Sequence, residues 1–420
     1  MPFLKSLRLD GILSFPPGSE PIPLTGLNVL IGPNGSGKSN LIEGIELLHA
    51  TPTGFSTAIR EGGGVREWLW KGDNASGIGT IEAHVEDYEF ELIPGSSLAM
   101  GGKRPDVPLT LRYKLSFVEL GHRVEITDEA IEDDATNGDE VVDARFHYRF
   151  QEGHSVVKAR TANTGGYDFS RFDLRAKREL DRKDIKPDES ILMQLKDSFA
   201  YPELTELGRQ FGQIATFREW TFGRYAAVRR PQRTDLAADV LASESSNLGM
   251  LLNQLVHLGA QSEFRRYLSR FLPRFERFST RVEGATIQFY LHENGLKQPV
   301  PATRLSDGTI RFMAILAQLL SPTPPPLICM EEPELGLHPD AIALLASLLQ
   351  EASTRTQLIV TTHSDALVSA LTKEFVDSVL VCEYRGGTVL KRVESEKLRF
   401  WLDKYRLGEI WRIGEIGGNL

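Results

Sequence analysis

The chain has 420 residues, of which 41% are hydrophobic and 25% are charged, and its formal net charge is −9. This is ordinary globular composition, and the acidic balance argues against a general basic coat for nucleic acid. No apolar stretch approaches the roughly 18 to 20 residues that cross a bilayer. We therefore expect a cytoplasmic protein with no membrane partner.

The first motif in chain order is a phosphate-binding loop. Residues 32–39 read GPNGSGKS and match the pattern G-x-x-x-x-G-K-[ST]. An expected strand at residues 27–31 precedes the loop and a helix-period segment at residues 40–49 follows it, which is the context that the motif requires. Such a loop wraps round a phosphate, with Lys38 as a point charge and Ser39 as a ligand of Mg²⁺.

The middle of the chain predicts two insertions. Residues 78–169 alternate apolar and polar side chains between turn signals, which is typical of an antiparallel β subdomain. Residues 196–281 read as helical and aromatic-rich, without the sustained heptads of long coiled-coil arms. Residues 218–281 carry eleven arginines against six acids. These arginines could bind the phosphates of DNA, and a solvated helix surface is the alternative.

A second set of motifs follows near the C-terminus. Ser306, Asp307 and Gly308 open a segment with helical periodicity, and the apolar run LICM then stops at Glu331 and Glu332. Two carboxylates at the end of a buried strand either mark the surface or hold a cation, and the upstream phosphate loop favours the cation. One would fix the metal's water shell and the other the attacking water, and strand alternation would point them to opposite sides.

After a predicted helix at residues 339–351, the β-rich run TQLIVTTHSDALV places His363 at the exit of a strand. The order of all these motifs resembles the ATPase heads of the ABC class that include RecF, Rad50, SMC and OLD-like ATPases. The chain is most similar to the predicted RecF-like ATPases of the AAA-21 group, which the phrases EEPELGLHPDAIALL and LGEIWRIGEIGGNL also resemble. The resemblance covers nearly the whole chain.

The resemblance implies an α/β fold, namely a three-layer α/β/α P-loop NTPase head of ABC type with an antiparallel β subdomain and an inserted helical lobe. We expect residues 1–195 to form the N-terminal half of the head with Walker A and the β subdomain. Residues 196–300 would form the inserted lobe. Residues 301–420 would form the C-terminal half with the signature, Walker B and a switch histidine.

The resemblance also implies a role for each matched residue in binding ATP and Mg²⁺. Walker A would comprise Gly32, Pro33, Asn34, Gly35, Ser36, Gly37, Lys38, Ser39 and Asn40, and the signature would comprise Ser306, Asp307 and Gly308. Glu331 would be the Walker B acid and a metal ligand with Ser39, Glu332 the general base or water-orienting carboxylate, and His363 the sensor of the γ-phosphate. A glutamine that reaches the metal would be Gln194, with Gln151 as second choice.

Two departures from the wider ABC pattern are visible. Asp307 replaces a glycine of the usual signature, and Glu331 stands where aspartate is commoner. The first raises the question of how strong the signature is. The second requires space for one extra methylene.

The function implied is an ATP hydrolase that acts as a dimerisation switch. Two copies would sandwich two Mg-ATP between P-loop and signature, and DNA or an effector such as a nuclease would couple to the inserted lobe, in DNA repair or phage defence. The alternative is a non-hydrolysing, nucleotide-sensing scaffold that recruits an effector. A transporter subunit is a third reading, which the extra β subdomain does not fit.

Overall fold

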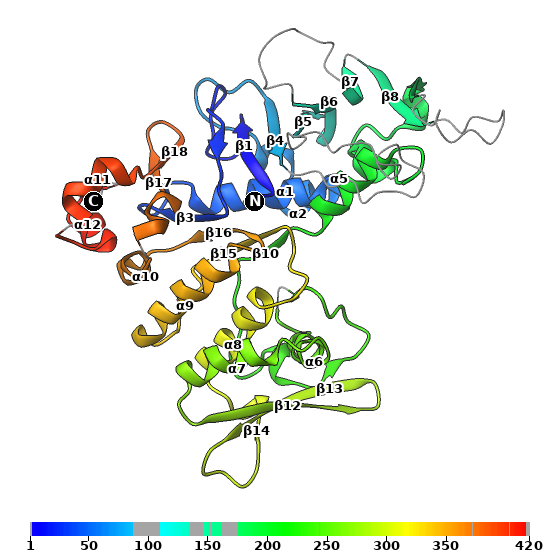
Figure 1. Ribbon diagram of the computed structural model, residues 1–420. Coiled ribbons are helices and arrows are strands. Elements are labelled where there is room, and N and C mark those ends of the chain that lie inside the picture. The colour runs from blue at the N-terminus through cyan, green and yellow to red at the C-terminus, as the bar shows by residue number, and fades with distance from the viewer. Residues whose placement is uncertain are drawn as a thin grey trace, which may run out of the picture. The chain divides into compact units, whose positions relative to one another are not determined.

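Figure 1 shows a computed structural model of the chain, in which two compact units are each assembled from separate stretches. The first unit comprises Met1–Thr25, Ser39–Ile214 and Tyr384–Val389, and the second comprises Gly26–Lys38, Ala215–Glu383 and Leu390–Leu420. The structure describes residues 2–86, 110–134, 146–151, 153–160, 175–242, 244–371, 373–402 and 404–416. The three-part division expected from the sequence stays a prediction.

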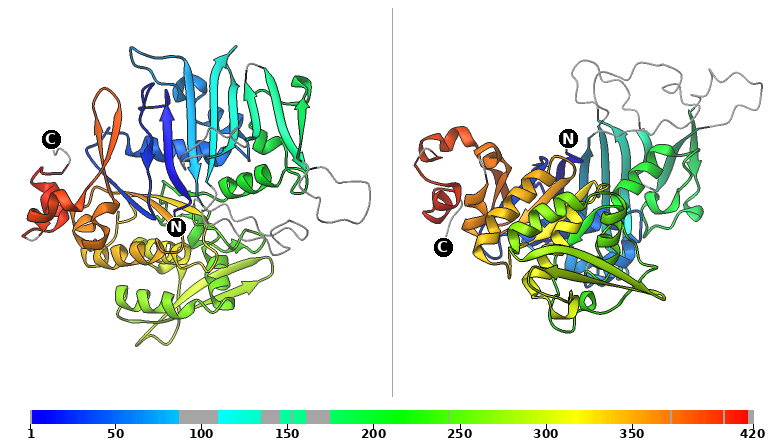
Figure 2. Two further views of the ribbon diagram at one scale, coloured as in Figure 1. Left: turned by 45° about the horizontal axis from the view of Figure 1, so that its top comes forward. Right: turned by 60° about the horizontal axis from the view of Figure 1, so that its bottom comes forward.

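The first unit is built on an antiparallel sheet, which runs across the upper part of the left-hand view in Figure 2. Within the described residues it has eight strands in the order β2-β1-β4-β5-β6-β7-β8-β9. Their bounds are β1 Leu4–Asp10, β2 Ile22–Pro23, β4 Ile78–Val85, β5 Leu111–Leu120, β6 Arg123–Asp133, β7 Phe146–Gln151, β8 His154–Arg160 and β9 Arg175–Leu180. Burial alternates along β4, and antiparallel pairing runs from β4 through β8, which confirms the expected antiparallel β subdomain for the described part of residues 78–169. Residues 87–109, 135–145, 152 and 161–169 of that range lie outside the described residues.

The helices of this unit are short apart from the one that follows the phosphate loop. They are α1 Lys38–Ala50, α2 Phe55–Glu61, α3 Val65–Trp68, α4 Ile191–Gln194 and α5 Pro202–Gly212. Helix α1 begins at the motif lysine, two residues before the helix-period segment seen in the sequence. The lysine therefore lies at the first turn of a helix, as a phosphate loop requires.

The second unit is built on a mainly parallel sheet in the order β10-β15-β16-β3-β17-β18, counted over the described residues. The strands are β10 Ala215–Phe217, β15 Leu327–Glu331, β16 Gln357–Thr361, β3 Leu27–Ile31, β17 Val379–Tyr384 and β18 Thr388–Arg392. Every residue of β3 and of β16 is buried. Continuous apolar runs suit parallel strands because such strands are covered on both faces, and the expected strands at 27–31 and 327–330 are confirmed.

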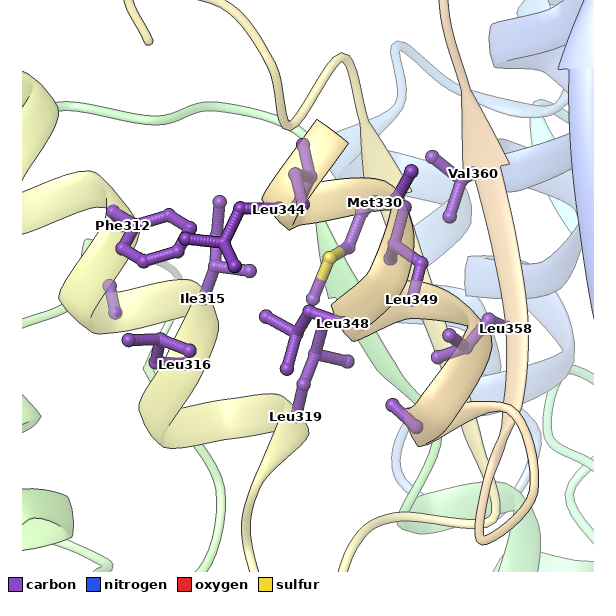
Figure 3. Close-up of a cluster of buried hydrophobic side chains, with 14 of the residues drawn as sticks. Phe312, Ile315, Leu316, Leu319, Met330, Leu344, Leu348, Leu349, Leu358 and Val360 are labelled. Atoms are coloured by element: carbon purple, nitrogen blue, oxygen red, sulfur yellow. The ribbon is translucent and has the colours of Figure 1, made fainter. Parts of the chain in front are cut away.

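Helices α8 Asp307–Leu319 and α9 Pro339–Ala352 contribute the main apolar side chains that pack with this sheet. Figure 3 shows Leu316 and Leu319 of α8, Leu348 of α9 and Met330 of β15 in one cluster. All four are fully buried. Both helices were expected from the sequence, and both are confirmed: α8 begins within the Ser-Asp-Gly segment, and α9 ends one residue beyond the expected 339–351.

Three further helices complete the C-terminal part of the second unit. They are α10 Asp365–Ala370, α11 Ser395–Leu402 and α12 Leu407–Arg412. Helix α12 packs closely on α10, because a Cβ on Gly408 would lie 2.0 Å from the carbonyl oxygen of Asp365. Only a glycine therefore allows this approach.

The expected helical lobe contains strands as well as helices. Helices α6 Leu248–His257 and α7 Gln261–Phe271 lie along a hairpin of β12 Phe275–Glu283 and β13 Thr286–Glu293 (Figure 1), and the short strands β11 Gln232–Arg233 and β14 Val300–Pro301 extend it. The sequence reading missed the hairpin because β12 is short of apolar residues, and only Phe275 and Phe278 are buried. None of the helices in the described residues combines the length and apolar character that crossing a membrane needs.

We predict that Leu348→Ala lowers the free energy of unfolding by about 2 to 5 kcal/mol, because it removes a fully buried side chain and leaves a cavity between α8, α9 and β15. Urea unfolding followed by circular dichroism measures the change. Leu335→Ala is the matched control, since Leu335 is 53% exposed and its truncation should cost less than about 0.5 kcal/mol. Equal losses in the two variants would contradict the assigned core.

Candidate functional site

The phosphate loop leaves the end of β3 in a conformation that only glycine tolerates. Gly32, Gly35 and Gly37 have φ angles of +148°, +76° and +100°. A Cβ on Gly32 would lie 2.2 Å from the carbonyl oxygen of Cys382 in the neighbouring strand β17. The loop is therefore bent by backbone geometry and held closely against β17, which leaves its N–H groups available to an anion.

Lys38 directs its charge into this loop. Its Nζ donates hydrogen bonds to the carbonyl oxygens of Gly32 at 2.9 Å and Pro33 at 3.0 Å. Burial lowers the pKa of Lys38, and the negative charges of Cys382, Glu332 and Glu331 oppose that shift. The two glutamates therefore act electrostatically on the lysine of the loop.

The two glutamates have different backbone positions. Glu331 is the last residue of β15, and its Oε1 lies 3.4 Å from Nε of Arg218. Glu332 follows the strand in the left-handed region at φ +44°, while its N–H donates to the carbonyl oxygen of Thr361 at 3.0 Å. Strand alternation does not set the direction of the Glu332 side chain, because this residue has left the strand.

His363 lies beside Glu332. Its Nε2 is 3.8 Å from Oε1 of Glu332, and burial together with the charge of Lys38 lowers its pKa. The imidazole is therefore neutral near pH 7 and can both donate and accept a hydrogen bond. A hollow of about 380 Å³ connects it to the phosphate loop and is lined by Gly32, Pro33, Asn34, His363, Asp365, Trp411 and Arg412.

The Ser-Asp-Gly segment starts helix α8. The hydroxyl of Ser306 caps the helix by accepting a hydrogen bond from the N–H of Thr309 at 3.1 Å. Ser306 and Asp307 are exposed. A Cβ on Gly308 would lie 2.9 Å from the carbonyl oxygen of Gly336, so this helix start packs against the loop that follows Glu332.

Comparison with known proteins identifies the family. A protein-family model described as "AAA domain, putative AbiEii toxin, Type IV TA system" (AAA_21) matches residues 27–86 and 120–369. The chain belongs to this family. A search of curated proteins finds no match.

Two solved structures show the same fold. One is an Smc head bound to the C-winged helix domain of ScpA, with a TM-score of 0.55 at 13% identity over 94% of this chain and 99% of that one. The other is an Smc head with an extended coiled coil bound to the C-terminal domain of ScpA, derived from Pyrococcus furiosus. Its TM-score is 0.52 at 12% identity over 96% of this chain and 99% of that one. The fold is therefore that of an ABC-type P-loop ATPase head.

Most of the predicted ATPase residues lie in the second unit. Walker A up to Lys38, the signature, Glu331, Glu332 and His363 belong to it, whereas Ser39 and Asn40 begin the first unit's part of α1. Within the second unit, the structure brings Lys38, Glu332 and His363 together around the phosphate loop. The roles of these residues remain predictions.

Gln194 and Gln151 belong to the first unit. The carboxamide of Gln194 accepts from the N–H of Lys186 at 2.7 Å and donates to the carbonyl oxygens of Lys186 and Glu189 at 3.1 and 2.7 Å. The carboxamide of Gln194 must break these hydrogen bonds before it can ligate a metal. Gln151 is exposed at the end of β7. The assignment of a glutamine metal ligand stays a prediction.

Glu334 is a residue that the sequence reading missed, although it stands in the quoted EEPEL. It is 8% exposed and accepts a hydrogen bond from the hydroxyl of Thr362, which in turn accepts from the N–H of Ser364 at 2.9 Å. Burial raises the pKa of Glu334, and hydrogen bonds from Thr362 and from the backbone of His363 oppose the shift. Glu334 therefore fixes the turn that presents His363.

Arg229 is the second residue that the sequence reading missed. Its guanidinium is 5% exposed and pairs with the carboxylate of Asp307. It also donates at 2.7 to 3.1 Å to four backbone carbonyl oxygens, those of Phe222, Gly223, Ala302 and Leu305. The clamp joins two segments about 75 residues apart in sequence, so no local pattern marks it. It explains how Asp307 is accommodated in the signature, where it is held by an arginine of the lobe.

We predict that Arg229→Ala lowers the free energy of unfolding by about 3 kcal/mol or more, because it leaves several buried carbonyl oxygens without donors. The control, Asp307→Asn, should cost less than about 1 kcal/mol because the Asp307 side chain is 66% exposed. Urea unfolding of both variants measures the difference. If the two losses were equal, the ion pair and not the carbonyl clamp would carry the stability.

Proposed function

We propose that this AAA_21 protein hydrolyses ATP and that ATP binding makes it dimerise. The observation that carries the proposal is the position of the Glu332–His363 pair beside the phosphate loop, because His363 and residues 32–34 line one hollow. A carboxylate and a neutral imidazole at this place can orient a water against a terminal phosphate. Lys38 supplies the cation that a triphosphate needs.

The residues present fit Mg²⁺. Oε1 of Glu331 is buried, forms an ion pair with Nε of Arg218 at 3.4 Å and accepts no hydrogen bond within the described residues. A carboxylate oxygen suits a hard cation, which would compete with Arg218 for this oxygen. The described residues contain no cluster of three or more His, Cys, Asp or Glu side chains. Glu331, phosphate oxygens and water would hold Mg²⁺, which would neutralise phosphate charge. Ser39 and Gln194 are the further ligands that the family resemblance implies.

Residues of the chain itself have separate parts in the proposed reaction. The N–H groups of the phosphate loop and Lys38 bind and orient the β- and γ-phosphates. Glu332 accepts the hydrogen bond of the attacking water and directs its oxygen at the γ-phosphorus. His363 contacts the γ-phosphate and keeps Glu332 in place, so the loss of the phosphate is communicated to the backbone around Thr361 and Thr362.

Dimerisation follows from the exposure of the signature. Ser306 and Asp307 are exposed at the start of a helix, where a hydroxyl and N–H groups can contact a phosphate of a second subunit. Two copies would then bind two nucleotides between P-loop and signature. The solved Smc heads carry ScpA domains, which supports an effector protein as a further partner here.

The family description names a putative toxin of a Type IV toxin–antitoxin system, which supports a role in phage defence over one in DNA repair. An effector such as a nuclease would supply the toxic activity. DNA contact through the arginines of the lobe has weaker support, because Arg266 is paired with Glu351 at 2.9 Å and Arg281 with Glu283 at 2.5 Å.

We predict that Lys38→Ala abolishes ATP binding, because it removes the one Walker A cation aimed at the β- and γ-phosphates. Isothermal titration calorimetry with Mg-ATP measures the affinity, and circular dichroism checks that the variant is folded. An unchanged ATP affinity would overturn the assignment of the phosphate loop.

We predict that Glu332→Gln leaves Mg-ATP binding intact and slows hydrolysis by about two to four orders of magnitude, the usual range for losing a general base. The stalled protein should accumulate as an ATP-bound dimer, which gel filtration with light scattering detects. Adding Ser306→Arg to Glu332→Gln is the control, since an arginine in place of the signature serine should keep the protein monomeric with ATP bound.

Three results would change the proposal. A Glu332→Gln monomer in the presence of Mg-ATP would contradict the sandwich dimer. Wild-type turnover by Glu332→Gln would move the catalytic carboxylate to another residue. If the wild type binds ATP but releases phosphate only at the background rate, the non-hydrolysing scaffold that recruits an effector is the better description.

A further inference from the structure

Strand β10 places an arginine beside the last residue of strand β15. Phe217, the last residue of β10, pairs in parallel register with Met330 of β15. Arg218 and Glu331 follow these two residues, so the register brings them next to each other. Nε of Arg218 lies 3.4 Å from Oε1 of Glu331. The register of the sheet therefore sets this ion pair.

Aromatic side chains hold the segment after β10 at this place. The indole Nε1 of Trp220 donates a hydrogen bond to the carbonyl oxygen of Glu331 at 3.0 Å. The ring of Trp220 also stacks with the rings of Phe217 and Phe222, whose centroids lie 5.5 and 5.9 Å away. Arg218 lies in sequence between two of these packed aromatic residues, so its backbone is fixed beside Glu331.

The ion pair is partly shielded from water. The side chain of Arg218 is 30% exposed and that of Glu331 is 18% exposed, and Oε1 of Glu331 is buried. Two charges interact more strongly in such a place than on an open surface. The guanidinium therefore neutralises a carboxylate that would otherwise carry its charge with little water around it.

We propose that Arg218 makes the site at Glu331 reject free divalent cations and accept Mg²⁺ that arrives with ATP. The inference rests on the proposed function, in which Glu331 holds the metal. A free divalent cation at Oε1 competes with the guanidinium for this oxygen and is repelled by its charge. Mg-ATP carries a net negative charge, so the same guanidinium attracts it. The charge of Arg218 is always present, because an arginine is not deprotonated in proteins.

The experiment compares free Mn²⁺ with Mg-ATP, because the inference predicts different effects on the two. Mn²⁺ suits the same oxygen ligands as Mg²⁺, and electron paramagnetic resonance detects it directly. In the full-length chain without nucleotide, Arg218→Gln should bind Mn²⁺ at least about fivefold more tightly than wild type, because the competing charge is gone. In calorimetry, the same variant should bind Mg-ATP no more tightly than wild type.

Three further variants separate the charge of Arg218 from its effect on folding. Arg218→Met also removes the charge and keeps an unbranched apolar stem, so it should match Arg218→Gln. Arg218→Lys keeps the charge, so its Mn²⁺ affinity should stay within about twofold of wild type. Arg274→Gln is the matched control, since Arg274 pairs with Glu293 at 3.3 Å at the hairpin of β12 and β13. It should leave both affinities unchanged.

Unchanged Mn²⁺ affinity in Arg218→Gln and Arg218→Met, including no detectable binding by either variant or by wild type, would overturn the inference. So would Mn²⁺ and Mg-ATP affinities that rise by the same factor. Glu331→Gln distinguishes this failure from a failure of the proposed function, because it should abolish the gain in Mn²⁺ affinity that Arg218→Gln brings. If Glu331→Gln leaves Mn²⁺ binding unchanged in both backgrounds, Glu331 is not the metal ligand, and the proposed metal site is wrong together with the inference.

Discussion

The parallel register of β3, β15 and β16 is the constraint on which the site depends. In this register Leu30 pairs with Thr361, and Thr361 pairs with Glu331, so three strands end in nearly the same row. The residues that follow are the start of the phosphate loop, Glu332 and the turn before His363. Because parallel strands bring their carboxyl ends to one edge, the phosphate loop after Ile31 meets two segments that follow Glu331 and Thr361, far along the chain.

That edge is also where the backbone departs from the usual conformations. Glu332 is one of few residues other than glycine with a positive φ among those described, a conformation that costs of order 1 to 3 kcal/mol. The N–H of Glu332 donates to the carbonyl oxygen of Thr361 in the next strand. Two residues further on, the buried Glu334 accepts a hydrogen bond from Thr362 and so fixes the turn before His363. The apolar cluster of α8, α9 and β15 supplies the rigidity that keeps this strained turn in place.

The sequence predicted the strands and the loop of the candidate site better than the contacts that support them. Strand β3, strand β15 and the phosphate loop follow from short-range patterns, namely short, mainly apolar runs and a glycine spacing. Three features escaped that reasoning. The side chain of Glu332 takes its direction from the left-handed φ of Glu332 itself. The hairpin of β12 and β13 was missed because the apolar pattern of β12 is sparse. The clamp of Arg229 joins segments about 75 residues apart, so no local pattern reveals it.

Close packing connects the turn at Glu332 to the exposed Ser-Asp-Gly segment. The loop after Glu332 reaches Gly336, whose carbonyl oxygen leaves no room for a Cβ on Gly308, and Ser306 lies one short turn away at the start of α8. Arg229 holds the other side of that helix start through Asp307. If the proposed loss of the γ-phosphate moves Glu332, the displacement would reach the start of α8, since close-packed backbone transmits small displacements. In the proposed dimer, each signature contacts the nucleotide bound by the other subunit. Hydrolysis at one site would therefore weaken the contact between that subunit's signature and the nucleotide at the second site.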